Sequence, residues 1–158
     1  MKELEIYIDG ASGGNPGPAG IGVILTQNGE VIKNMSVHLG TQTNNVAEYM
    51  ALIFGLQEAL ILGVSTVKIY TDSQLLCRQI NKEYKIKSSN LIGLYYQVQH
   101  LLSAFRSTEI KYISRDKNKG ADKLAKKAIK EKHQTQAKVA TPPSKQHKSA
   151  EKQDIFRF

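Results

Sequence analysis

Residues 4–25 read LEIYIDGASGGNPGPAGIGVIL and contain two strand patterns. Every second residue from Leu4 to Ile8 is apolar, which is the period of a strand with one buried face. The stretch from Gly10 to Gly20 is rich in glycine and proline, and it predicts a turn. Residues 21–25 are mostly apolar and predict the second strand. The chain therefore opens with two strands that a turn connects.

Apolar periodicity continues from there to residue 130. Asn28-Gly29 separates the second strand from a third over residues 31–39, and this dipeptide is a strong signal for a tight hairpin. Apolar spacing then predicts helices over 44–62, 73–81, 90–105 and 118–130, and strands over 67–70 and 109–113. Three strands in a meander followed by helix–strand units indicate an α/β fold. We expect a five-stranded mixed sheet, with three antiparallel and two parallel strands, flanked by helices.

The composition excludes several classes of protein. The chain has 158 residues and one cysteine, Cys77, so a disulfide framework and a cysteine-based zinc site are both excluded. No apolar run approaches the roughly 20 residues of a membrane span, and the N-terminus lacks the apolar core of a signal peptide. We expect a cytoplasmic protein without membrane contact. The formal net charge of +8 suits an acidic phosphate partner, although a basic charge also serves solubility alone.

The character of the sequence changes near residue 131. Residues 1–130 form the predicted globular domain, whereas residues 131–158 contain six Lys or Arg, three Asp or Glu and few apolar residues. Such a segment buries too little apolar surface to offset its ordering entropy, so we predict a disordered basic tail. Its last residues, Gln153–Phe158, fit either a docking motif for another protein or chance residues at a frayed end.

Four acidic residues stand at strand ends or near helix starts: Asp9, Glu48, Asp72 and Asp122. Each has an ordinary explanation. Asp9 fits a turn, Glu48 fits a capping box with Asn45, and the other two fit helix starts, where the helix dipole favours acids.

Taken together, these acids predict a metal site. Three of them lie at or beside element ends that a mixed sheet brings to one edge, where ligand sites are common. Carboxylates in close contact repel one another and lose hydration, so a bound cation is needed to hold them. Oxygen donors without cysteine or paired histidine favour Mg²⁺ or Mn²⁺. On a basic protein, the cluster predicts phosphodiester hydrolysis with two metal ions.

Four motifs carry a family resemblance. They are Asp9–Gly20, Thr43–Glu48, Tyr70–Gln74 and Asn118–Ala125. In this order they resemble the four motifs of type 1 ribonuclease H, and the resemblance covers residues 1 to about 130. It implies a ribonuclease H-like fold and an endonuclease that cuts the RNA strand of RNA–DNA hybrids. The implied products carry 3′-hydroxyl and 5′-phosphate ends, and the implied cofactors are two Mg²⁺ ions, with Mn²⁺ as an alternative.

The resemblance also implies residue roles. Asp9 and Asp72 lie between the two metals, Glu48 binds one metal and touches a ribose 2′-hydroxyl, and Asp122 binds the second metal. The 2′-hydroxyl is the group that distinguishes RNA from DNA. Thr43 contacts a phosphate of the DNA strand. The full set of implied substrate contacts is Gly10, Ser12, Asn15, Thr43, Asn44, Asn45, Gln74 and Asn118.

Two departures from the family pattern leave other functions open. Residues 114–120 contain no histidine, which many members carry in a longer loop there, and only Lys82, Lys85 and Lys87 occupy the place of a basic protruding helix. We therefore expect slower turnover, and weaker substrate binding unless the basic tail supplies it. One alternative is a catalytically weak or inactive module that binds hybrids or double strands. Another is a DNA-cutting nuclease of the same fold. We expect a monomer.

Overall fold

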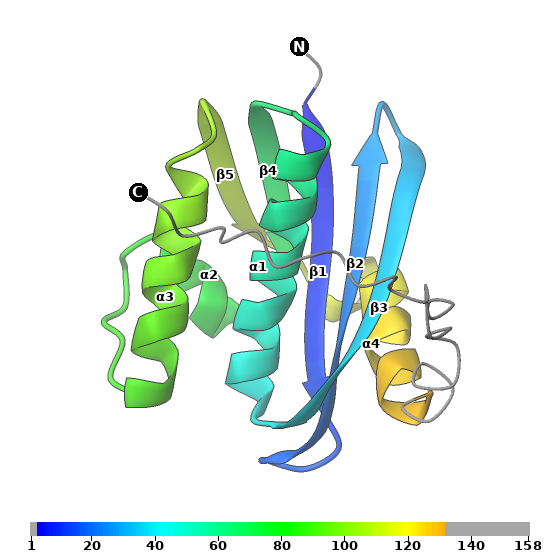
Figure 1. Cartoon of the computed structure of the whole chain (residues 1–158), viewed down its shortest axis with the longest axis vertical. Coiled ribbons are helices and arrows are strands. Elements are labelled where there is room, and N and C mark those ends of the chain that lie inside the picture. The colour runs from blue at the N-terminus through cyan, green and yellow to red at the C-terminus, as the bar shows by residue number, and fades with distance from the viewer. Residues whose placement is uncertain (1–2, 132–158) are drawn as a thin grey trace, which may run out of the picture.

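The computed structural model describes residues 3–131, which form one sheet with helices on both faces (Figure 1). The strands are β1 (Leu4–Ser12), β2 (Gly17–Gln27), β3 (Glu30–Gln42), β4 (Thr66–Thr71) and β5 (Ser107–Tyr112). The helices are α1 (Asn44–Ile61), α2 (Gln74–Ile80), α3 (Ser89–Leu102) and α4 (Lys119–Lys130), with a short 3₁₀ helix η1 (Arg115–Lys117).

The strand order β3-β2-β1-β4-β5 confirms the predicted mixed sheet. β1 pairs antiparallel with β2, and β2 with β3, while β4 runs parallel to both β1 and β5. Asn28 and Gly29 both have positive φ, at 54° and 79°, as a two-residue hairpin turn of the predicted type requires.

The predicted turn from Gly10 to Gly20 is wrong over most of its length. β1 continues to Ser12 and β2 begins at Gly17, so only residues 13–16 connect the strands. A Cβ atom added at Gly10 would lie 2.2 Å from the backbone carbon of Ala47, and one at Gly22 would lie 2.0 Å from the carbonyl oxygen of Ala121. These glycines let α1 and α4 pack directly on the strands.

The two faces of the sheet carry different helices. Ile21, Val23 and Leu25 of β2 belong to the main core on the side of α1 and α3, whereas Gly22 lies against α4 on the opposite side. This arrangement buries β2 on both faces over most of its length, whereas in β1 Glu5 and Tyr7 on the second face are only half-buried. No helix within residues 3–131 is long and apolar enough to cross a membrane.

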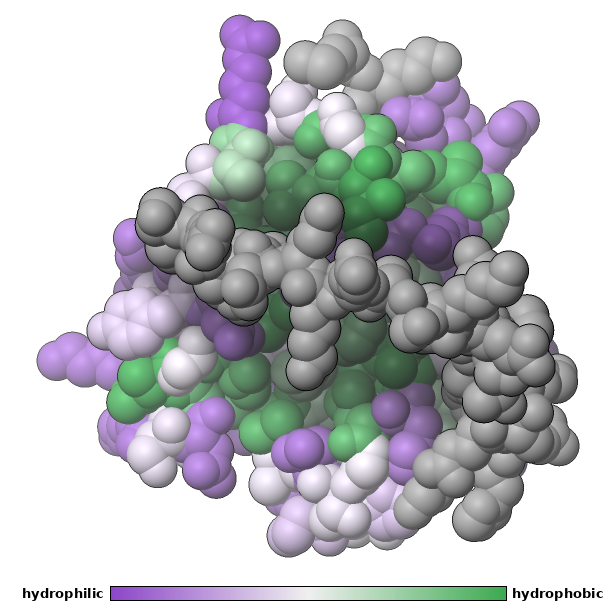
Figure 2. Space-filling view, in the orientation of Figure 1, coloured by the Kyte–Doolittle hydropathy of each residue, from purple (hydrophilic) through white to green (hydrophobic). Residues whose placement is uncertain are grey.

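Some apolar side chains are left exposed where α1 ends and the β2–β3 hairpin turns. Val31 is 59% exposed and Ile61 is 75% exposed. Figure 2 shows apolar surface over this end of α1 and the neighbouring hairpin. The predicted tail, including its docking segment Gln153–Phe158, lies outside the described residues.

Candidate metal centre

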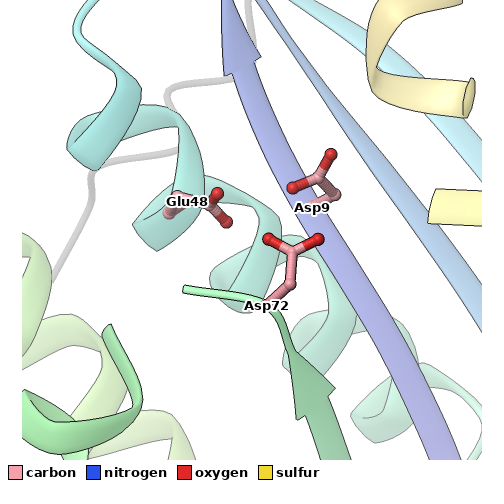
Figure 3. A group of neighbouring side chains, drawn as sticks. All are labelled: Asp9, Glu48 and Asp72. Atoms are coloured by element: carbon pink, nitrogen blue, oxygen red, sulfur yellow. The ribbon is translucent and has the colours of Figure 1, made fainter. Parts of the chain in front are cut away.

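Three carboxylates meet beside the carboxyl end of β4, next to β1. Asp9 lies on β1, Glu48 on α1, and Asp72 directly after β4. Because β1 and β4 are parallel, with Ile8 opposite Thr71, Asp9 and Asp72 come to the same edge side by side. One oxygen of each carboxylate lies within 4.8 Å of the others, and Figure 3 shows the three side chains pointing toward one another.

The start of α1 places Glu48 in this group. Thr43 is the N-cap, and its Oγ1 accepts a hydrogen bond of 3.2 Å from the Val46 N–H. The capping box of Asn45 with Glu48 is therefore wrong. The Glu48 carboxylate instead accepts a hydrogen bond of 3.1 Å from the Gly10 N–H, across to β1. The close packing of α1 on Gly10 thus fixes where this carboxylate lies.

Burial and mutual repulsion disfavour the charged forms of these acids. Asp9 is 5% exposed, and burial together with the charge of Asp72 raises its pKa to about 8. Burial and the neighbouring charges of Asp9 and Asp72 raise the pKa of Glu48 well above its ordinary range. In residues 3–131, no Lys or Arg forms an ion pair with any of the three. The described part of the chain therefore supplies no basic side chain to the cluster.

Asp122 stands beside the cluster rather than within it. Its carboxylate also contributes to the raised pKa of Asp9, through a hydrogen bond and through its charge, so it lies close to Asp9. It forms an ion pair of 3.0 Å with Lys126, one turn further along α4, whose side chain is largely exposed. An exposed pair of this kind is weak and leaves the carboxylate available to a metal ion.

The donor set fits a hard divalent cation. The three converging groups are all carboxylates, and no cysteine or histidine within the described residues joins them. Oxygen donors of this kind suit Mg²⁺ or Mn²⁺. A cation would also offset the repulsion that raises the pKa of Asp9 and Glu48.

Polar side chains named by the sequence lie beside the acids. The Asn44 Oδ1 accepts from the Ser12 N–H at 3.0 Å and from the Ser12 hydroxyl at 2.9 Å. The Asn44 N–H donates to the Asn15 Oδ1 at 3.2 Å. Asn45 and Gln74 are exposed at the starts of α1 and α2. These five residues therefore form a polar, largely exposed rim next to the carboxylates.

Two residues expected to contact substrate are turned to the protein interior instead. Gly10 is buried, and its N–H is already bonded to Glu48. Asn118 is 2% exposed, and its Nδ2 donates to the Ile8 carbonyl at 2.8 Å and to the Asp72 Oδ2 at 3.2 Å. Sequence reasoning missed this role, because an asparagine just before a helix looks like a cap or an exposed contact.

The two departures from the family pattern are visible in the fold. η1 occupies the short connection between β5 and α4, where Arg115 and Lys117 are exposed. Lys85 and Lys87 line a hollow of about 620 Å³ together with Asn45 and Tyr84. Lys85 and Lys87 therefore lie near Asn45 of the polar rim.

The strand order, the flanking helices and the carboxylates at the sheet edge define a ribonuclease H-like fold. The family model described as "Reverse transcriptase-like" matches residues 7–128. The chain belongs to this family.

Three known proteins illustrate the similarity. Bifunctional protein Rv2228c of Mycobacterium tuberculosis is 39% identical over 142 residues, which cover 89% of this chain and 39% of that protein. Ribonuclease HI of Halobacterium salinarum is 35% identical over 127 residues, which cover 80% of this chain and 64% of that protein. The crystal structure of LC11-RNase H1 in complex with an RNA/DNA hybrid has a TM-score of 0.78 and 36% identity, over 82% of this chain and 99% of that chain. The present chain thus spans well under half of the mycobacterial relative.

Proposed function

We propose that this chain is a ribonuclease H that hydrolyses the RNA strand of RNA–DNA hybrids, leaving 3′-hydroxyl and 5′-phosphate ends. The observation that carries the proposal is the meeting of Asp9, Glu48 and Asp72 from three separate elements, without a basic partner among the described residues. The similarity to a ribonuclease HI and to a structure that holds an RNA/DNA hybrid supports this substrate.

We propose a mechanism with two divalent cations, Mg²⁺ or Mn²⁺. Asp9, Glu48, Asp72 and Asp122 would hold these ions. Bound divalent cations lower the pKa of an attacking water and stabilise the leaving oxygen. The raised pKa of Asp9, to about 8, means that this carboxyl must release its proton as a cation binds. Cation binding is therefore expected to strengthen as the pH rises.

The polar rim supports recognition of the hybrid. Ser12, Asn15 and Asn44 form one hydrogen-bonded group next to Glu48, and amides and hydroxyls can bond to a 2′-hydroxyl or a minor-groove edge without adding charge. Thr43 caps the N-terminus of α1, where free backbone N–H groups favour an anion such as a DNA phosphate. Asn45 and Gln74 are exposed at neighbouring helix starts.

A second candidate function is a hybrid-binding module with little or no catalysis. The short connection through η1 favours it, because no histidine stands there to handle protons. The three converging carboxylates argue for catalysis. We propose that the protein acts as a monomer in the cytoplasm; both points remain predictions from the sequence.

The test is cleavage of a labelled RNA–DNA hybrid with Mg²⁺ or Mn²⁺ by the wild-type chain and the Asp72→Asn variant. Asp116→Asn is the matched control, because Asp116 is an exposed acid on η1. We expect metal-dependent RNA cleavage by the wild type and the control only. Binding without cleavage in either metal would favour the second function. Equal cutting of an all-DNA duplex would assign a different nuclease activity.

A further inference from the structure

Asn118 occupies an unusual position for a residue at a helix start. It is the N-cap of α4, yet its side chain makes no capping hydrogen bond. An asparagine at this position normally bonds to a backbone N–H of the first turn. Here the side chain is buried and points away from its own helix, and it bonds to β1 instead.

The contacts of Asn118 reach three segments that carry acids. Its Nδ2 donates to the carbonyl of Ile8, the residue before Asp9, at 2.8 Å. The same nitrogen donates to the Asp72 Oδ2 at 3.2 Å. The backbone carbonyl of Asn118 accepts the first hydrogen bond of α4, from the Asp122 N–H at 3.1 Å. The side chain of Asn118 therefore links β1, at the residue before Asp9, to the acid after β4, while its backbone begins α4.

The orientation of the Asn118 amide is set by its neighbours. If the amide were turned over, its oxygen would face the Ile8 carbonyl and the Asp72 carboxylate, and acceptors would meet without a proton. Oδ1 has no hydrogen-bond partner among residues 3–131. The donor side of the amide therefore makes every contact of this side chain.

We propose that Asn118 is a positioning residue, which holds Asp72 and the Ile8–Asp9 part of β1 in the arrangement that binds metal ions. This inference rests on the proposed function. Asp72 follows the last residue of β4, so the sheet does not fix its side chain, and the hydrogen bond from Nδ2 limits its rotation. Hydrogen bonds that orient metal ligands change metal affinity or activity by roughly 10- to 100-fold when they are removed. A direct substrate contact would instead act mainly on KM.

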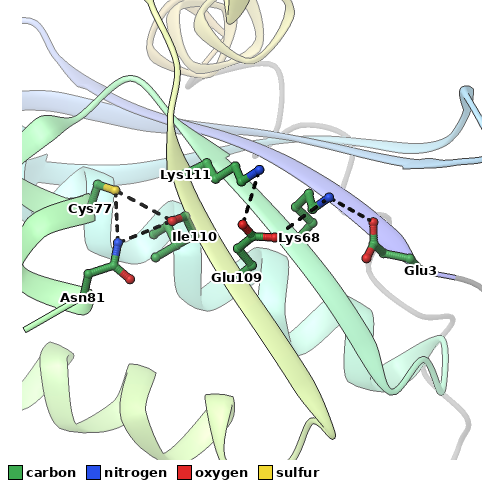
Figure 4. A network of polar contacts seen from close by, with 7 residues as sticks. All are labelled: Glu3, Lys68, Cys77, Asn81, Glu109, Ile110 and Lys111. Atoms are coloured by element: carbon green, nitrogen blue, oxygen red, sulfur yellow. Dashed lines mark hydrogen bonds and ion pairs between the residues drawn. The ribbon is translucent and has the colours of Figure 1, made fainter.

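The experiment compares Asn118→Ala and Asn118→Ser with the matched control Asn81→Ala. Asn81 also donates its side-chain amide to a strand carbonyl, that of Ile110 at 3.4 Å, and to the Cys77 Sγ at 3.5 Å, and it bonds to none of the four acids (Figure 4). The serine variant keeps one donor and serves as the measurement if the alanine variant fails to fold. Calorimetry with Mn²⁺ on the metal-free full chain gives metal affinity, and hybrid cleavage gives kcat and KM.

We expect Asn118→Ala to weaken Mn²⁺ binding and lower kcat by roughly 10-fold or more, with KM within about twofold of the wild type. Asn118→Ser should fall between alanine and wild type, and Asn81→Ala should match the wild type. Unchanged Mn²⁺ affinity and kcat, or a rise in KM alone, would overturn the positioning role. A wild-type chain that neither binds Mn²⁺ nor cleaves the hybrid would instead overturn the proposed function.

Discussion

Two glutamates on α1 have opposite electrostatic surroundings. Glu58, near the end of the helix, is 7% exposed, and its Oε1 lies 2.5 Å from the Nζ of Lys33 on β3. Glu48, near the start of the helix, faces Asp9 and Asp72 and has no ion-pair partner among the described residues. Within the described part of the chain, a lysine pairs with Glu58 and no basic residue pairs with Glu48.

This difference separates a structural acid from one kept for a ligand. A carboxylate shielded from water is costly unless a positive charge or hydrogen bonds compensate it. Lys33 meets that need for Glu58, whereas Glu48 has only the Gly10 N–H and two further acids nearby. Within residues 3–131, no positive charge compensates Glu48, so a bound cation or a proton is needed to do so. The contrast can be tested by changing each end of α1 in turn.

Replacing either glutamate of α1 with glutamine should give the largest difference, which is in the rate of hybrid cleavage. Glu48→Gln removes a proposed metal ligand and is expected to lower hybrid cleavage by about 10³-fold or more. Glu58→Gln changes only the pair with Lys33 and should leave cleavage within about twofold of wild type. Initial rates at saturating Mg²⁺ measure both. Similar losses in the two variants would show that the contrast does not separate function from structure.

Metal addition should distinguish the same two variants by stability. A cation that binds only the folded chain stabilises it by about 3 kcal/mol at a concentration roughly 100 times its dissociation constant. We expect Mn²⁺ to raise the melting temperature of the wild type and of Glu58→Gln, and to have little effect on Glu48→Gln. Thermal unfolding followed by circular dichroism, with and without chelator, provides the measurement. An equal rise in all three proteins would place the cation elsewhere.

Without metal, the cluster should destabilise the fold as the pH rises. Asp9 keeps its proton in the folded state up to about pH 8, whereas the unfolded chain releases it near the ordinary value of 3.8. The free energy of unfolding therefore falls between these pH values. Asp9→Asn removes this loss and should stabilise the metal-free protein by roughly 2 kcal/mol at pH 8 and very little at pH 4. Urea unfolding of the variant and the wild type at both pH values tests this expectation. The same difference in free energy of unfolding between the two proteins at pH 4 and at pH 8 would contradict it.

Removing the cation that the chain does supply should have the smallest effect. Lys33→Met leaves Glu58 without its partner, but the Lys33 side chain is 47% exposed and water screens the interaction. We expect a loss of about 1 kcal/mol in the free energy of unfolding, with unchanged Mn²⁺ affinity and cleavage. Urea titration and calorimetry on the same preparation measure both. A change in metal affinity would mean that the two ends of α1 are not independent.

The elements of the fold follow from local patterns in the sequence. The apolar period from Leu4 to Ile8 and the Asn28-Gly29 turn predict β1 and the β2–β3 hairpin, because alternation and positive φ are properties of a few neighbouring residues. The sequence also predicts that acids meet, and three of the four, Asp9, Glu48 and Asp72, do converge, although Asp9 lies within its strand and Glu48 on a helix rather than at strand ends.

What the sequence does not reveal depends on contacts between distant segments. A glycine in a turn and a glycine under a helix look alike in the chain, so Gly10 and Gly22 are assigned to their strands only once α1 and α4 are in place. Glu48 bonds to the Gly10 N–H, 38 residues away, rather than within its own helix turn. The inward orientation of Asn118 has the same origin, because its partners lie on β1 and after β4.

The amide of Asn118 joins the first strand to a late segment of the chain, and this has a consequence for biosynthesis. A polypeptide leaves the ribosome from its N-terminus, so Ile8 and Asp72 emerge well before Asn118 and Asp122. While a nascent chain ends before these residues, α4 cannot cover β1 and Asp72 lacks its bond to the amide. Activity should therefore begin only when translation has passed this point.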